Sequence, residues 1–382
     1  MRALVRYAFR SLGRRPLTAV LLAVSLGIAF GLPGAVRSVV AAFEEELTAR
    51  ADAAPLVFGA AGSRSDLVLH ALFFRSDPPG EIRVADRKEF DSHGLAETVP
   101  LCVKATVRGV PVVGTDGGYF KLRRLRLDAG DPISRLGDCV LGARAAERLG
   151  LKAGEKAATD PENLFGASGG TPVRLRITGV LAAMGSADDD TAFVSLETAW
   201  LIAGLGHGHS GGSKTHAHED RESTSSGYVE VTDENVEGFH FHGRPERFPL
   251  TAVIAIPHSR DDRLLLISRY LRTDEGTAVA ESDRVLRDLL SVAVRVRRLF
   301  DANAVVTTCA MILLCATVVT LSVRLRWPEV QTMHRLGLSR TRIASLFAIE
   351  VLIVGLGAFA LGLTIVLASH AAAPVIFKWF VV

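Results

Sequence analysis

The chain has 382 residues, of which 48% are hydrophobic, and its formal net charge is +3 at pH 7. A charge this small over this length gives no basis for a surface that coats nucleic acid, so no nucleic-acid partner is expected. The hydrophobic share instead favours a folded domain combined with membrane-spanning helices. Four cysteines are too few for a disulfide scaffold, although Cys102 and Cys139 leave room for one disulfide in the middle of the chain.

The first long uncharged run covers residues 17–36 and follows a basic segment, residues 1–16. A helix of this length crosses about 30 Å of hydrocarbon, and the preceding arginines place the N-terminus in the cytoplasm. The run is longer than the apolar region of a cleaved signal peptide, so we expect it to be retained as a transmembrane helix over 17–40.

Small residues recur at every fourth position of this first helix. Ala23, Gly27 and Gly31 would lie on one face, which predicts a surface that another helix can approach closely. The alternative is chance composition of an apolar run.

Two further apolar runs lie in the last part of the chain and predict transmembrane helices over 303–323 and 343–370. The segment between them, 324–342, carries five arginines against one acid, so it is expected in the cytoplasm. Three crossings then place residues 41–300 outside the cytoplasm. They leave a short tail, 371–382, on that outer side or in the interface.

The region at 41–300 has the alternation of a mixed α/β domain. Residues 173–178 alternate apolar and polar side chains, which predicts a strand, and 251–257 predicts a second, more buried strand. A short helix is predicted over 138–149, and an amphipathic helix over 281–300 runs directly into the second apolar run. The fold class is therefore an α+β membrane protein, with three transmembrane helices and a large extracytoplasmic mixed α/β core domain between the first two.

Two more segments of this region have a distinct character. Residues 37–50 continue the first apolar run with a helical pattern, so two helices are expected to form a stalk at the ends of the domain. Residues 204–227 are rich in Gly, Ser, His and charge without an apolar period, which predicts a mobile insertion.

Six of the eleven histidines fall within 36 residues. The H-x-H spacing places two imidazoles on one side of an extended chain, and imidazole is a common ligand for zinc and other transition metals. Phe239 and Phe241 would face the other side of such a strand. We hypothesise a zinc or other transition-metal site, against the alternative of a solvated tract that binds metal weakly without function. The candidate ligands are His207, His209, His216, His218, His240 and His242.

The acidic run of Asp188, Asp189 and Asp190 suggests either a divalent-cation site or a capped turn, and the capped turn is favoured. No Ser/His/Asp or Cys/His arrangement is recognisable. The string GGSKT at 211–215 lacks the glycine that a P-loop has before its lysine, so it is not an ATP-binding loop.

Segments in the middle and near the end of the chain resemble the FtsX/MacB-like permeases of ABC transporters, a type VII, mechanotransmission-type family. They read VVGTDGGYFKLRRLRLDAGDPISRLGDCVLGARAAERLGLKAGE at 112–155, VRLRITGVLAAMGSADDDTAFVSLETAW at 173–200 and RLRWPEVQTMHRLGLSRTRIASLFAIE at 324–350. The resemblance implies an inner-membrane protein with one N-terminal helix, a periplasmic core domain and a C-terminal helix bundle. Members of the family usually have a fourth helix near the C-terminus. In this chain, only residues 373–382 lie where that helix would begin. A divergent subfamily, a truncated gene and a three-helix variant stay open.

The resemblance also implies a function. The chain would be a permease subunit without ATPase activity, which couples ATP hydrolysis by a separate ABC ATP-binding subunit to movement of the extracytoplasmic domain. A second copy or a related permease chain, and an extracytoplasmic partner protein, are the further partners implied.

The segment 324–342 would contact the ATPase, since Pro328 can start a short helix there and Gly337 can end it. The candidate coupling residues are Glu329, Arg335, Leu336, Gly337, Ser339 and Arg340. A basic loop with only topological meaning is the alternative. Two other functions stay open: a membrane-tethered metal-binding or sensing protein without an ATPase, and a component of a metal-uptake permease.

Overall fold

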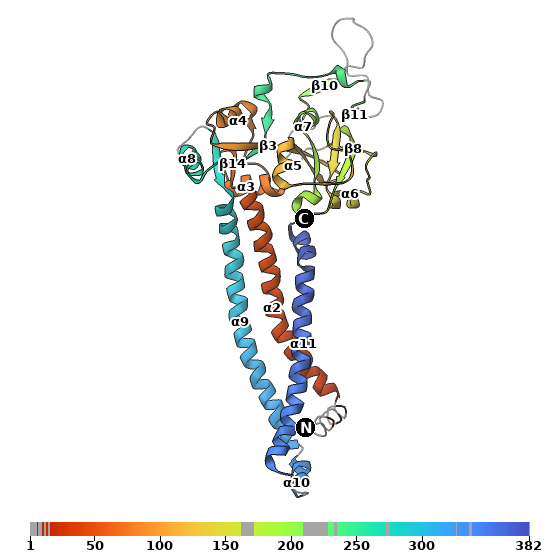
Figure 1. The fold of residues 1–382 in the computed structure, drawn as a ribbon, viewed down its shortest axis with the longest axis vertical. Helices are drawn as coiled ribbons and strands as arrows, with labels where there is room; N and C mark the ends of the chain where they lie inside the picture. The colour runs from red at the N-terminus through yellow and green to blue at the C-terminus, as the bar shows by residue number, and fades with distance from the viewer. Residues whose placement is uncertain are drawn as a thin grey trace. The chain divides into compact units, whose positions relative to one another are not determined.

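The structure is a computed structural model that describes residues 6, 10, 13, 16–161, 172–208, 228–232, 235–271, 276–325, 327–335 and 338–381. The chain divides into two compact units. Met1–Glu45 together with Leu289–Val382 form one, called the helical unit below, and Glu46–Asp288 form the other, called the core domain (Figure 1).

Long helices make up the helical unit, and two of them continue into the core domain. They are α2 (Pro16–Ala53), α9 (Ser282–Leu325) and α11 (Arg340–Val381), with the short α10 (Trp327–Arg335) between the last two. The helices predicted over 37–50 and 281–300 are confirmed as parts of α2 and α9. By length and composition, two helices in the described part of the chain could cross a membrane, at Ala19–Ala53 and Arg340–Ala372. The crossing expected over 303–323 lies within α9 and stays a prediction.

Close packing joins α2 to α11 within the helical unit. A Cβ added at Gly27 would lie 2.8 Å from Cδ2 of Leu361, and one added at Gly31 would lie 3.0 Å from Cα of Gly362. Only residues without a side chain allow backbones this near to each other. The face of α2 that carries its glycines therefore lies against α11.

Polar contacts also connect α2 to both other long helices. Arg37 Nε donates to Oδ1 of Asp301 in α9 at 2.7 Å, and Ser38 Oγ lies 3.2 Å from Nδ1 of His370 in α11.

An 11-stranded sheet forms the centre of the core domain, in the order β11-β8-β6-β9-β4-β3-β14-β1-β15, with β5 and β7 paired to β8. The strand pairs β4–β9, β6–β8 and β11–β8 are parallel, and the others are antiparallel. The strands are β1 (Leu56–Ala60), β3 (Ala96–Val107), β4 (Val110–Thr115), β5 (Leu127–Gly130), β6 (Asp138–Leu141), β7 (Lys156–Ala158), β8 (Val173–Leu181), β9 (Ala192–Ser195), β11 (Val229–Glu230), β14 (Ala252–Pro257) and β15 (Thr277–Glu281). Two small sheets pair β2 (Ile82–Arg83) with β13 (Pro249–Leu250) and β10 (Gly206–Gly208) with β12 (Phe239–Phe241).

The helices of the core domain cover two hydrophobic clusters. One cluster includes residues of β3, β4, β6, β8 and β9 with α6 and α7, and the other includes residues of β1, β14 and β15 with α4 and α8. Leu196 and Trp200 of α7 pack against both clusters, so the two hydrophobic clusters meet at α7. The helices are α3 (Arg64–Phe73), α4 (Val84–Asp91), α5 (Gly117–Arg123), α6 (Ala143–Leu149), α7 (Leu196–Ile202), α8 (Arg260–Tyr270), and the 3₁₀ turns η1 (Ala187–Asp190), η2 (Val236–Gly238) and η3 (Pro245–Arg247).

The strands predicted at 173–178 and 251–257 are confirmed as parts of β8 and β14. The helix predicted over 138–149 is wrong for its first four residues, which form β6, and correct for α6. All four residues of β6 are buried between β8 and β9, and a short apolar run of this kind does not distinguish strand from helix by its periodicity.

The mobile insertion predicted over 204–227 is wrong at its start, where β10 pairs with β12. A Cβ at Gly206 would lie 2.9 Å from the Phe241 ring, so the glycine lets the ring cover the strand. Residues 209–227 lie outside the described residues.

The two cysteines of the core domain are buried and free, so the disulfide left open by the sequence is not formed. Cys102 in β3 lies opposite Gly114 in β4, Gly114 opposite Val194 in β9, and Val194 opposite Cys139 in β6. Three strand spacings separate the thiols by about 14 Å, which no disulfide can span.

Candidate functional site

Arg50, in the last turn of α2, lies inside the core domain with 1% of its side chain exposed. Its Nη1 and Nη2 donate to the two carboxylate oxygens of Asp188, each at 3.0 Å, in a bidentate pair. Its Nε donates to the carbonyl of Leu72, and its guanidinium carbon lies 5.4 Å and 5.9 Å from the ring centroids of Phe73 and Phe74. The end of α2 is thus fixed by a fully paired charge.

Side chains of α5 and of Ser186, the residue before η1, complete the surroundings of the Asp188 carboxylate. Tyr119 Oη donates to it at 2.7 Å, Ser186 Oγ at 3.1 Å and Arg123 Nε at 3.2 Å. Burial acts to raise the pKa of Asp188, but the charges of Arg50 and Arg123 and the hydrogen bonds from Arg50 and Tyr119 together lower it well below its usual range. Burial and the nearby carboxylate raise the pKa of Tyr119, so its hydroxyl stays a donor.

The three carboxylates of η1 have different partners. Asp189 accepts hydrogen bonds from the backbone N–H groups of Met184 at 3.0 Å and Gly185 at 2.7 Å, so the predicted capped turn is confirmed for this residue. Asp190 accepts hydrogen bonds from Arg144, whose Nη1 also lies 3.5 Å from Oδ2 of Asp189. In the part of the chain that the structure describes, no group of His, Cys, Asp and Glu side chains is arranged to hold a metal ion.

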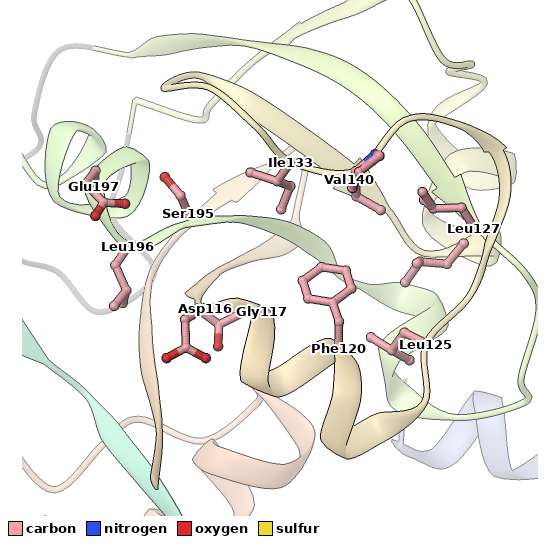
Figure 2. Close-up of a pocket in the computed structure, with 13 residues that line it drawn as sticks. Asp116, Gly117, Phe120, Leu125, Leu127, Ile133, Val140, Ser195, Leu196 and Glu197 are labelled. Carbon is pink, nitrogen blue, oxygen red and sulfur yellow. The ribbon is translucent and has the colours of Figure 1, made fainter. Parts of the chain in front are cut away.

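A cavity of about 480 Å³ opens in the core domain beside α5. Figure 2 shows the side chains of Phe120, Leu125 and Leu127 toward one end of it and the carboxylates of Asp116 and Glu197 toward the other. Asp116 also caps α5, where its Oδ1 accepts a hydrogen bond from a backbone N–H. The cavity therefore has one apolar end and one end, called the acidic end below, where the two carboxylates lie beside Leu196.

The short helix predicted to start near Pro328 is found as α10, Trp327–Arg335, and Arg335 is its last residue. Ser339 precedes α11, its carbonyl accepts a hydrogen bond from the N–H of Ile343, and Arg340 is the first residue of that helix. Two predicted coupling residues, Leu336 and Gly337, lie outside the described residues, and Glu329 is described by its backbone alone. A contact of this segment with an ATPase stays a prediction.

Among the candidate metal ligands, His240 of β12 lies opposite His207 of β10. The ring centroids of His240 and His242 are 4.9 Å apart. Phe239 and Phe241 pack against the hydrophobic core while His240 and His242 are exposed, so the predicted separation of the two pairs is confirmed. The remaining candidates, His209, His216 and His218, lie outside the described residues.

A family model of the MacB-like periplasmic core domain matches residues 17–237. The chain belongs to this family. The resemblance to FtsX/MacB-like permeases inferred from the sequence is thereby confirmed. The match covers Arg50, Tyr119 and Asp188, so the buried ion pair lies within the MacB-like region.

Two solved structures are similar to the chain. The periplasmic region of MacB from Actinobacillus actinomycetemcomitans is 13% identical, with a TM-score of 0.33, over 61% of this chain and 91% of that one. The extracellular domain of the noncanonic ABC-type transporter YknZ from Gram-positive bacteria is 13% identical, with a TM-score of 0.32, over 59% of this chain and 99% of that one. No curated protein matches the chain.

Proposed function

We propose that this chain is the permease-type subunit of an ABC transporter and couples ATP hydrolysis by a separate subunit to movement of its core domain outside the cytoplasm. That movement would serve transport or extrusion across the cell envelope. Membership of the MacB-like family supports the proposal. The observation that carries it is that α2 is one unbroken helix, Pro16–Ala53, whose last turn is fixed in the core domain by Arg50. Under this proposal, α2 would carry a displacement from one of its ends to the other.

The start of α9 supports the same function. Strand β15 runs directly into α9 at Ser282, and Arg263 of α8 donates to Glu281 at 3.1 Å and to Asp283 at 2.8 Å. The first turn of α9 is therefore held by ion pairs of the core domain, as the last turn of α2 is. Both stalk helices would transmit displacement in either direction along their axes.

The ATP-binding subunit is proposed to contact α10 and the residues that follow it, and a second copy of the chain or a related permease would complete the assembly. Changing Leu336 to Asp places a charge in an apolar contact and should weaken association with the ATPase at least severalfold. The measurement is recovery of the ATPase, identified by mass spectrometry, with the tagged full chain.

Leu264→Asp is the matched control, because Leu264 is 59% exposed on α8 of the core domain. It should recover as much ATPase as the unchanged chain. Equal recovery with both variants would show that the segment 324–342 is only a connector.

A metal-binding function is the second candidate, and the pairing of His207 with His240 beside His242 favours it. Neutral imidazoles bind zinc at about 2.0 to 2.1 Å, and protonation removes them as ligands. Zinc titration of the full chain at pH 7.5 and pH 5.5 should show stoichiometric binding that is lost at the lower pH and in a His240→Ala, His242→Ala variant. Weak binding that the double change leaves intact would reject the site.

A further inference from the structure

The cavity beside α5 leaves apolar surface of the core domain open to solvent. Leu127, on β5, is 36% exposed, and every residue of β5 is exposed. The ring of Phe120 and the buried side chain of Leu181 in β8 also line the cavity. A volume of about 480 Å³ lies within the range of small-molecule sites, which is roughly 300 to 1,000 Å³.

At the end of the cavity away from Phe120 and Leu127, both charged side chains are acidic. Among the described residues that line the cavity, Asp116 and Glu197 carry the charge, and no lysine, arginine or histidine is present. The Oδ2 of Asp116 lies 3.8 Å from Arg87, while Glu197 is exposed and forms no ion pair with any described residue. This end therefore has negative charge in excess of its local cations.

The wall of the cavity is also part of the ionic network of α2. Gly117 and Phe120 of α5 line the cavity, and Tyr119 and Arg123 of the same helix donate to Asp188. A ligand that displaces α5 would alter the surroundings of the Asp188 carboxylate.

We propose that this cavity binds a small amphiphilic cation, with its apolar group against Phe120, Leu125 and Leu127 and its ammonium group at Asp116 and Glu197. The shape separates these two chemistries at opposite ends (Figure 2). Buried apolar contact supplies most of the attraction, and the carboxylates set the sign of the charge that is accepted. All residues of the site belong to the core domain, so binding can be measured with the full chain and without an ATPase.

The test is calorimetric titration of the full chain in lipid nanodiscs, with empty nanodiscs subtracted, using phenylpropylamine, phenylpropanol and phenylpropanoate as probes. The amine should bind about fivefold tighter than the alcohol, which has the same apolar group, and the carboxylate should bind weakest. Equal binding of all three probes, tightest binding of the carboxylate, or no binding at all would overturn the proposal.

Variants separate the two ends of the site. Glu197→Gln combined with Asp116→Asn should remove the preference for the amine and leave binding of the alcohol unchanged; asparagine still caps α5. Leu127→Ala should weaken binding of the amine and of the alcohol by the same factor. Glu89→Gln, at an exposed acid of α4 that does not line the cavity, is the matched control and should change neither. Amine binding that persists in the double variant would overturn the assignment of the acidic end.

Discussion

Arg50 and Asp188 are 138 residues apart in the chain and are each 1% exposed. Removing two charges from water costs several kcal/mol per ion, and their attraction offsets this cost only when the remaining donors and acceptors are also satisfied. Tyr119, Arg123 and Ser186 satisfy the carboxylate, and a backbone carbonyl accepts from the guanidinium Nε. A displacement of α2 would leave a buried charge without its partner, so the pair specifies one position of the helix end.

Changing Arg50 to Met should destabilise the core domain by about 3 to 5 kcal/mol, because the buried carboxylate of Asp188 loses its bidentate partner. The measurement is the melting temperature of the full chain in detergent, followed by near-ultraviolet circular dichroism. Arg83→Met is the matched control, since Arg83 is 65% exposed and its pair with Asp86 lies at the surface. A melting temperature as high in the Arg50 variant as in the control would contradict this role of the pair.

His70 of α3 is buried and its Nδ1 lies 2.6 Å from the carbonyl of Ser76. Burial lowers the pKa of His70 to about 4, although the hydrogen bond to Ser76 and the charge of Asp77 act to raise it. An unfolded chain binds a proton at this histidine near pH 6.5, whereas the folded chain resists it down to about pH 4. The unfolded state therefore holds more protons in this window, and stability falls as the pH falls.

Acidification from pH 6.5 to pH 4 should accordingly reduce stability through His70 by about 3 kcal/mol. His70→Gln removes this titration, so the melting temperature of that variant should decline less over the same range. The titration of Asp188 does not add to this loss of stability. A carboxylate whose pKa is lowered in the folded state stabilises the fold above its ordinary pKa, and this stabilisation is lost only below about pH 4. Parallel decline in both proteins would assign the acid sensitivity to other groups.

The helices and strands that the sequence predicts correctly are those whose apolar residues recur with a clear helical or strand period. The alternation of β8 is seen in its burial, which switches at every residue from Val173 to Leu181, and the helical period of 281–300 is found in α9. The boundary between β6 and α6 has no such period. It depends on Gly142, where a Cβ would lie 2.3 Å from the carbonyl oxygen of Asp188, a contact that only the folded chain creates.

The candidate site is less predictable than the elements for the same reason. The histidine and arginine segments can be found by composition, but Arg50 and Tyr119 have no local signal, since their partner Asp188 is brought to them by the sheet. The cavity beside α5 is likewise formed by residues of seven separate elements, β4, α5, β5, β6, β8, β9 and α7, and their loops.

The packing of α2 on α11 can be tested with a cross-link. The Cβ of Ala23 lies 3.8 Å from the Cβ position of Gly357, within the range of about 3.5 to 4.5 Å that a disulfide requires. Ala23→Cys with Gly357→Cys, in a chain with Cys309 and Cys315 changed to Ser, should form an intramolecular disulfide on mild oxidation, detected by mass spectrometry of the proteolytic fragments. Ala23→Cys with Gly355→Cys is the control, because nothing lies within 4 Å of a Cβ at Gly355. Equal yields from both pairs would reject this register.

At the scale of the whole molecule, the proposed function requires the core domain and α10 to lie on opposite sides of one membrane. Apolar side chains exposed on α2 and α11, such as Leu21 at 55% and Leu352 at 61%, suit contact with lipid rather than water. With three crossings, the arginines of 324–342 stay with the N-terminus, and the strands of the core domain are on the other side. Two crossings, without the 303–323 segment, would place the core domain and α10 on the same side.

Labelling of single cysteines distinguishes these arrangements. In cells whose outer membrane alone has been made permeable, Ser339→Cys, before α11, should resist a membrane-impermeant maleimide, and Ser268→Cys, exposed on α8 of the core domain, should react. Both variants carry Cys309→Ser and Cys315→Ser. Cys102 and Cys139 need no replacement, because burial raises the pKa of Cys102 to about 12 and also raises that of Cys139, which leaves both as unreactive thiols. Labelling of both positions after the inner membrane is broken controls for accessibility. If both cysteines are labelled in cells whose outer membrane alone has been made permeable, 303–323 does not cross the membrane, and α10 cannot be the contact for a cytoplasmic ATPase.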